Sequence, residues 1–201
     1  MLRDLAMFII KEPPKPPKQV FHLATPAHML AKLGWEIRQF KSLLISAPSE
    51  LWGAVHLSYG AFNTAVTAWH CGDWAWRSAG AGKSELADRF GFRLNKNDRR
   101  NLDALYKAIT AECRELHICR DIANGSKHMG ADGADPDVSV QVIWQPTDAA
   151  DAMNWECYLV ILDRGETIRA EEVFERAFTY WERLFGELGY IEGQFIDVRP
   201  R

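Results

Sequence analysis

Large apolar residues between positions 52 and 76 recur in steps of three and four, the spacing that places side chains on one face of an α-helix. Thr25 followed by Pro26 is a typical helix start, because the hydroxyl can cap free amides and proline suits the first turn. The pattern predicts a first helix over 26–45 and a second over 49–79, with a break at 47–48.

The second helix is predicted to bury a line of large, mostly aromatic residues against a neighbouring helix. Asp73 is the single charge in this line, and a narrower polar track beside it holds His56, Asn63 and His70. The aromatic line consists of Trp52, Val55, Tyr59, Phe62, Val66, Trp69, Asp73 and Trp76.

Two more helices are predicted after a glycine-rich break. A short one covers 84–90 with Ser84 as its cap, and a third long helix runs from an Asn97 cap to about His128, with Gly125 weakening its end. The apolar line of the long helix consists of Leu102, Leu105, Ile109, Cys113 and Leu116.

The C-terminal part predicts strands followed by a helix. Two strand-like runs, 138–144 and 155–162, form an antiparallel hairpin after a loop rich in glycine and aspartate. Amphipathic spacing over 173–188 predicts a last helix that ends at Gly189. The expected fold is mainly α: a helical bundle of three long helices plus a short one, with a small antiparallel β-hairpin near the C-terminal helix.

The first twenty residues are predicted to be separate from this domain. Residues 11–18 hold four prolines and favour an extended connector. The apolar run 5–10, LAMFII, is expected to dock as a third strand on the sheet edge, with a partner-binding arm as the alternative. The expected organisation is therefore an N-terminal segment and connector (1–20), one helical domain (21–190, hairpin at about 138–162) and a tail (191–201).

Composition restricts the partners that the chain can have. Its 201 residues carry a net charge of −3, so it lacks the basic excess of a general nucleic-acid binder, although a local basic groove stays open. Four cysteines without a CxxC pair indicate neither a disulfide framework nor a zinc ribbon. The leading segment resembles neither a signal peptide nor a membrane span, so a cytoplasmic protein without a membrane partner is expected.

The sequence AGAGKS at 79–84 has the glycines, lysine and serine of a phosphate-binding loop. The full pattern needs a glycine where the chain has Arg77, and a preceding strand where a helix is predicted. A turn between helices is the better interpretation.

The densest polar run is HICRDIANGSKH at 117–128, beside a predicted loop. His117, Asp121, Asn124 and His128 are separated by four, three and four residues, which puts them on one helical face. A solvated charged face is the structural alternative. The candidate catalytic residues are Arg120, Asp121, Asn124 and His128, supported by His70, Asp73, His117 and Lys127.

Two segments carry a resemblance to known proteins. TAWHCGDWAW (67–76) and RDIANGSKH (120–128) resemble an uncharacterised group of bacterial and phage-borne helical proteins over roughly residues 50–130. More loosely, the bundle with Arg120 and a later His128 is similar to the HEPN ribonucleases of phage, mobile-element and defence systems. Their motif places four to six residues between arginine and histidine, and this chain has seven.

The HEPN resemblance implies metal-independent RNA cleavage without a cofactor. His128 would move a proton to or from the reacting 2′-hydroxyl or the leaving oxygen, and Arg120 would stabilise charge on the phosphate. Asp121 and Asn124 would orient these groups. RNA is then the expected partner.

Two other hypotheses remain open. Facing helices could assemble a metal site for zinc, iron or manganese from His70, Asp73, His117, His128 or Asp121. Alternatively, the protein is a non-enzymatic interaction protein in which the polar residues only fix helix register, and His70 with Asp73 forms a buried hydrogen-bonded pair. A homodimer and an unidentified protein partner are also left open by the sequence.

Overall fold

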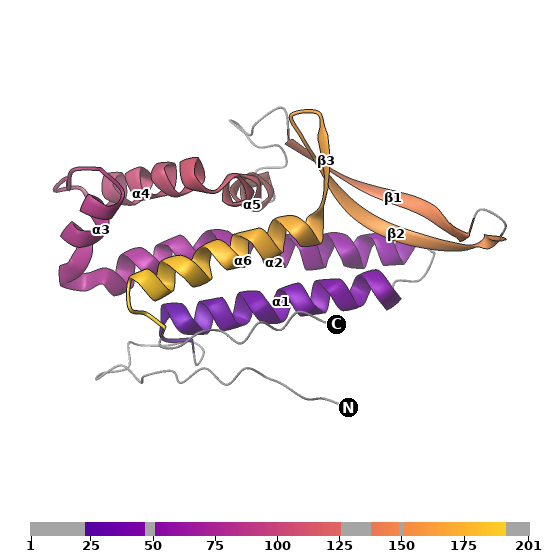
Figure 1. Cartoon of the computed structure of the whole chain (residues 1–201), viewed down its shortest axis with the longest axis horizontal. Helices are drawn as coiled ribbons and strands as arrows, with labels where there is room; N and C mark the ends of the chain where they lie inside the picture. The colour runs from indigo at the N-terminus through magenta and orange to yellow at the C-terminus, as the bar shows by residue number, and fades with distance from the viewer. Residues whose placement is uncertain (1–22, 47–50, 126–137, 149–150, 192–201) are drawn as a thin grey trace.

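The computed structural model describes residues 23–46, 51–125, 138–148 and 151–191. This part of the chain is mainly helical with a small antiparallel sheet, as predicted (Figure 1). The elements in chain order are α1 (Pro26–Ser46), α2 (Leu51–Ala79), η1 (Gly80–Gly82), α3 (Lys83–Arg89), α4 (Asp98–Glu112), α5 (Arg114–Gly125), β1 (Val138–Asp148), β2 (Asp151–Asp163), β3 (Glu166–Arg169) and α6 (Ala170–Glu187).

Helices α1, α2 and α6 form the central layer of the bundle and run alongside one another (Figure 1). The predicted cap of α1 is confirmed, since the backbone N–H of His28 donates to Thr25 Oγ1 at 3.3 Å. Deep in the core, the indole N–H of Trp181 on α6 donates to the carbonyl oxygen of Ala68 on α2 at 2.8 Å. This bond satisfies the buried indole and fixes α6 along α2.

The buried face of α2 differs from the predicted aromatic line. Trp52 and Tyr59 are 66% and 63% exposed, whereas Trp76 at the other end of the line is buried. Close packing of three helices leaves room only for small side chains along most of α2, so its aromatic residues lie elsewhere. The buried residues of this face are Leu57, Ala61, Thr64, Ala65, Ala68, Cys71 and Ala75.

The predicted single helix from Asn97 to His128 is wrong, because the chain breaks at Cys113. Asn97 does cap α4, accepting hydrogen bonds from the backbone of Arg99 and Arg100. Cys113 is extended, with φ −136° and ψ 104°, and α5 then turns across the bundle (Figure 1). Burial of apolar side chains explains the turn. Cys113 and Leu116 are both buried, whereas a straight continuation of α4 would carry the apolar residues of this segment away from the core.

The predicted hairpin is confirmed, with β1 antiparallel to β2 and Val142 opposite Leu159. Its strands extend further than predicted, because Pro146 lies within β1 opposite Trp155. The third strand is β3, joined to β2 by a tight turn in which Arg164 and Gly165 have φ of 52° and 84°. The N-terminal strand predicted at 5–10 lies outside the described residues and stays a prediction.

Helix α6 follows β3 directly and ends close to the predicted Gly189. Gly189 has φ 68°, and the N–H of Tyr190 donates to the carbonyl of Phe185 at 2.8 Å, which is the hydrogen bond of a Schellman motif. No helix within the described ranges is both long and apolar enough to cross a membrane.

Candidate functional site

Three polar side chains lie side by side on α5. The guanidinium of Arg120 donates from Nε and Nη2 to Oδ1 of Asp121, at 3.0 and 2.9 Å. His117 Nε2 lies 3.3 Å from the other oxygen of Asp121 and 3.4 Å from Arg120 Nη2. We refer to His117, Arg120 and Asp121 as the α5 cluster.

Asp121 is the buried member of the α5 cluster. Its side chain is 6% exposed, against 21% for His117 and 29% for Arg120. A buried carboxylate is costly unless it is paired and hydrogen-bonded, and here Arg120 and His117 of the same helix lie against it. Asp121 therefore acts as an anchor that holds a cation and an imidazole at the surface.

Arg120 keeps donors available while it is anchored. Both of its bonds to Asp121 use Nε and Nη2, and Nη1 donates to no atom in the described part of the chain. Guanidinium groups present several donors in a fixed plane, so one edge can bind a carboxylate while another binds a phosphate. The arrangement leaves Arg120 able to bind an external anion.

His117 Nε2 faces both an acceptor and a donor. With a proton on Nε2, the imidazole donates to Asp121; without one, Nε2 can accept from Arg120 Nη2. Imidazole is the side chain that changes protonation most readily near neutral pH. The two alternatives make His117 suited to moving a proton next to a fixed positive charge.

The start of α5 is attached to the sheet. Arg114 donates from Nε and Nη2 to the carboxylate of Asp163 on β2, at 3.0 and 2.5 Å. Leu116 and Cys119 are fully buried on the same helix. These contacts fix α5 as a whole, so the α5 cluster stands on a rigid element.

Of the other site residues predicted on this segment, the structure describes only one. Asn124 is half-buried in the last turn of α5. Lys127 and His128 lie outside the described residues, so the predicted pairing of Arg120 with His128 stays a prediction.

On α2, Asp73 belongs to a contact with α4 that the sequence did not predict. Burial, the charge of Asp73 and a hydrogen bond with its carboxylate raise the pKa of Tyr106 well above its ordinary value. The Tyr106 ring stacks on Trp69 with 3.9 Å between centroids, and its hydroxyl lies 3.4 Å from the Trp69 carbonyl oxygen. Asp73 thus lies close enough to Tyr106 to affect its titration, while His70 is half-buried on α2.

The residues described here contain no group of three histidine, cysteine, aspartate or glutamate side chains arranged to hold a metal. No such group therefore forms among the described candidates His70, Asp73, His117 and Asp121, and His128 lies outside the described residues.

Burial raises the pKa of all four cysteine thiols, that of Cys113 to about 11, so these residues are protonated near neutral pH.

The glycine-rich segment 79–84 forms the turn between helices that the sequence predicted. Lys83 pairs with Asp98 at 2.9 Å, and its ammonium lies 4.5 Å from the ring centroid of Trp76. The Trp76 indole also donates to Asp98 at 3.0 Å. Lys83 thus joins the turn to α4.

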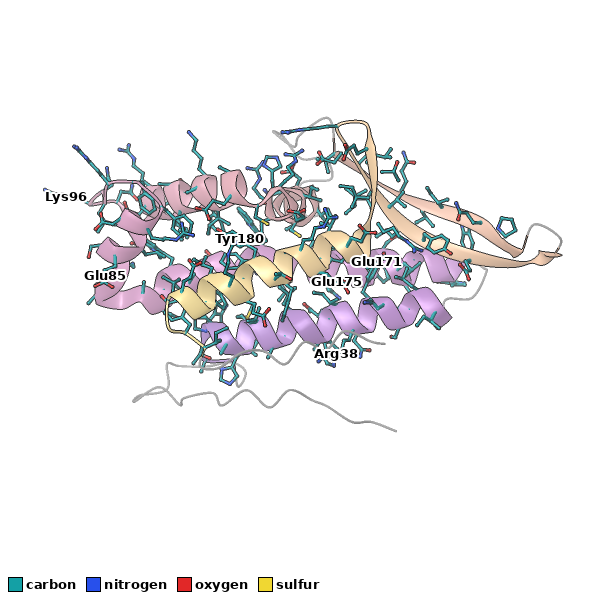
Figure 2. The ribbon with its side chains drawn as sticks, viewed as in Figure 1. Arg38, Glu85, Lys96, Glu171, Glu175 and Tyr180 are labelled. Atoms are coloured by element: carbon teal, nitrogen blue, oxygen red, sulfur yellow. The ribbon has the colours of Figure 1, made fainter. Side chains whose placement is uncertain are left out.

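A surface hollow of about 310 Å³ lies near the break between α4 and α5, lined mainly by charged residues. Its polar groups are already engaged: Tyr180 donates to Glu112 at 2.9 Å, Arg176 binds Glu115 at 3.4 Å, and Arg89 from outside the hollow binds Glu112 at 2.9 Å. Tyr180 points from α6 toward α4 in Figure 2. The hollow thus contributes to helix packing.

The α5 cluster combines an anchored carboxylate, a cation with an available edge and an imidazole within 3.4 Å of that cation. Such a set can bind a phosphate and transfer a proton beside it. Comparison of the chain with protein-family models, with curated proteins and with solved structures finds no match.

Proposed function

We propose that the protein is a HEPN-like, metal-independent ribonuclease and that the α5 cluster binds the phosphate at which RNA is cut. The observation that carries this proposal is the Arg120 guanidinium, which is held by Asp121 through one edge and keeps Nη1 for an anion. Its contact with His117 supplies a proton carrier at the same place.

In the proposed reaction, the 2′-hydroxyl of RNA attacks the adjacent phosphorus. The bond between O2′ and phosphorus forms, and the bond from phosphorus to the leaving 5′-oxygen breaks. One imidazole accepts the 2′-hydroxyl proton, and a protonated imidazole donates to the leaving oxygen. The products are a 2′,3′-cyclic phosphate and a free 5′-hydroxyl.

The proposed roles rest on the contacts of the α5 cluster for Arg120, His117 and Asp121, and on the sequence alone for His128. Arg120 stabilises the negative charge that grows on the phosphate oxygens. His128, which follows Gly125 by three residues, is the expected proton carrier, and His117 is the second imidazole of the proposal. Asp121 orients Arg120 and His117 without touching the substrate, so it is a positioning residue.

Cleavage of end-labelled single-stranded RNA in EDTA tests the proposal. We expect the parent protein to cut RNA and to leave DNA of the same sequence intact, because DNA lacks the attacking 2′-hydroxyl. Arg120→Ala and His128→Ala should lose cleavage. The matched controls are Arg38→Ala and His56→Ala, which remove an exposed arginine of α1 and an exposed histidine of α2.

No cleavage by the parent across several RNAs, or equal cleavage by all variants, would remove the ribonuclease hypothesis. If the parent protein shows no activity and Asp121→Asn lowers the melting temperature, the α5 cluster has the structural role of fixing helix register.

A further inference from the structure

Positive charge gathers at the start of α4 and along its outer face. Residues 93–107 carry five positive and two negative charges, a net of +3, in a chain whose net charge is −3. All five cationic side chains are exposed, and none forms an ion pair with another described residue. The α4 basic patch, as we call it, consists of Arg93, Lys96, Arg99, Arg100 and Lys107.

Neither of the two carboxylates in this stretch, Asp98 and Asp103, forms an ion pair with the patch in the described part of the chain. Asp98 accepts hydrogen bonds from Lys83 at 2.9 Å and from the Trp76 indole at 3.0 Å. Those bonds and the nearby charge of Arg77 lower the pKa of Asp98 further than its slight burial raises it. Asp98 is directed toward Lys83 and Trp76, and Asp103 is exposed and pairs with no described residue, so the five cations remain available to solvent.

Two of these cations stand where a helix disfavours them. Arg99 and Arg100 lie in the first turn of α4, at the positive end of the helix dipole, and their backbone amides are already capped by Asn97. The helix dipole therefore disfavours the positive charge of both side chains. An external polyanion is the partner that would stabilise such a concentration of positive charge.

Helix α4 leads from this patch toward the α5 cluster. Fifteen helical residues span about 22 Å, a length of several nucleotides. Figure 2 shows Lys96 at the far end of α4 from α5. Cys113 then joins α4 to α5, which lies on the same side of the bundle as α4 but turns across it (Figure 1).

We infer that the α4 basic patch binds the sugar-phosphate backbone of single-stranded RNA and guides it to the α5 cluster. This inference rests on the proposed ribonuclease function and names its substrate class. A single strand fits because attack by the 2′-hydroxyl needs a flexible backbone in which the attacking and leaving oxygens align. A stacked A-form duplex holds its backbone away from that geometry.

Binding is measured apart from cleavage with a fluorescein-labelled 2′-O-methyl RNA of about 12 nucleotides, which cannot be cut because its 2′-oxygen is blocked. Fluorescence anisotropy over a salt series compares the parent with Arg99→Ala/Arg100→Ala. The matched control is Arg38→Ala/Arg164→Ala, which removes one exposed arginine from α1 and one from the turn between β2 and β3. Melting temperatures check the fold, and the patch variant should melt at or above the parent temperature, since alanine suits a first helical turn better than arginine.

The patch variant should bind about tenfold more weakly than the parent, and the slope of log Kd against log salt should fall by about 1.4 for two lost phosphate contacts. The control variant should bind like the parent. Equal binding of the RNA by all three proteins would overturn the inference. Displacement of the RNA by polyglutamate at matched charge would also overturn it, and would indicate an acidic protein as the ligand of the patch. Neither outcome affects the cleavage assay, in which Arg120→Ala is compared with the parent. The inference about the α4 basic patch can therefore fail while the ribonuclease proposal stands, and the two failures are distinguishable.

Discussion

Arg114 at the start of α5 and Asp163 at the end of β2 are joined by two hydrogen bonds of 3.0 and 2.5 Å. Asp163 is 8% exposed and Arg114 is 26% exposed, so the pair is largely removed from water. It connects the helix that carries the α5 cluster to the sheet.

Removal of Arg114 should destabilise the protein. Arg114→Met takes the guanidinium away from a buried carboxylate and should lower the free energy of unfolding by about 2 kcal/mol, less than a fully buried pair would lose, because Arg114 is partly exposed. Urea denaturation measures the loss, and Arg38→Met is the control on α1. A loss no greater than that of Arg38→Met would contradict the assigned role of the pair.

Gly72 should not tolerate a larger side chain. A Cβ atom at this position would lie 2.4 Å from Cε1 of Tyr106, inside the contact between α2 and α4. Gly72→Ala should therefore cost about 1–3 kcal/mol and disturb the stacking of Tyr106 on Trp69, seen as a change in near-ultraviolet circular dichroism.

Gly186 in α6 is the matched control, because a Cβ there meets nothing within 4 Å. Gly186→Ala should stabilise the protein by about 0.5–1 kcal/mol, since alanine favours the helix. Equal stability of the two alanine variants would show that Tyr106 does not pack as described.

Glu112 should make stability depend on pH. Burial alone would raise the pKa of this carboxyl, but hydrogen bonds from Arg89 and Tyr180 hold its pKa below the ordinary 4.5. A lowered folded-state pKa contributes stability above the unfolded value, and this contribution is lost as the pH falls through the folded-state pKa.

Glu112→Gln should accordingly be less stable than the parent at pH 7, and the difference should shrink as the pH falls below 4.5. Urea denaturation at several pH values measures this, with the exposed Glu85→Gln as control. A difference between parent and Glu112→Gln that stays constant from neutral to acidic pH would exclude the linkage.

Local chemistry explains which parts of the fold the sequence predicted. The Thr25 cap, the Asn97 cap and the Gly189 end each depend on a few neighbouring residues, so a pattern along the chain is sufficient to find them. The strand pairing of the hairpin follows in the same way from its alternating residues.

The misplaced features depend on packing between distant segments. Nothing in the residues around Cys113 marks the break between α4 and α5, because neither glycine nor proline is present there. Because α1 and α6 lie close to α2, mainly small side chains of α2 fit into the core. The spacing of Trp52 and Tyr59 in the sequence does not indicate that these two residues are exposed.

The same distinction applies to the candidate site. His117 and Asp121 lie four residues apart on one helix, so their contact was predictable from spacing. The stacking of Tyr106 on Trp69 and the pairing of Arg114 with Asp163 join distant parts of the chain, and no local pattern indicates them.

The most direct test of the α5 cluster is the rate of RNA cleavage by Arg120→Lys in EDTA. Lysine keeps the charge but cannot bind Asp121 with two nitrogens and offer a third to phosphate. The account predicts a rate about a hundredfold below that of the parent, in a variant that stays folded at the assay temperature by circular dichroism. A lysine variant that cleaves RNA as fast as the parent would contradict it.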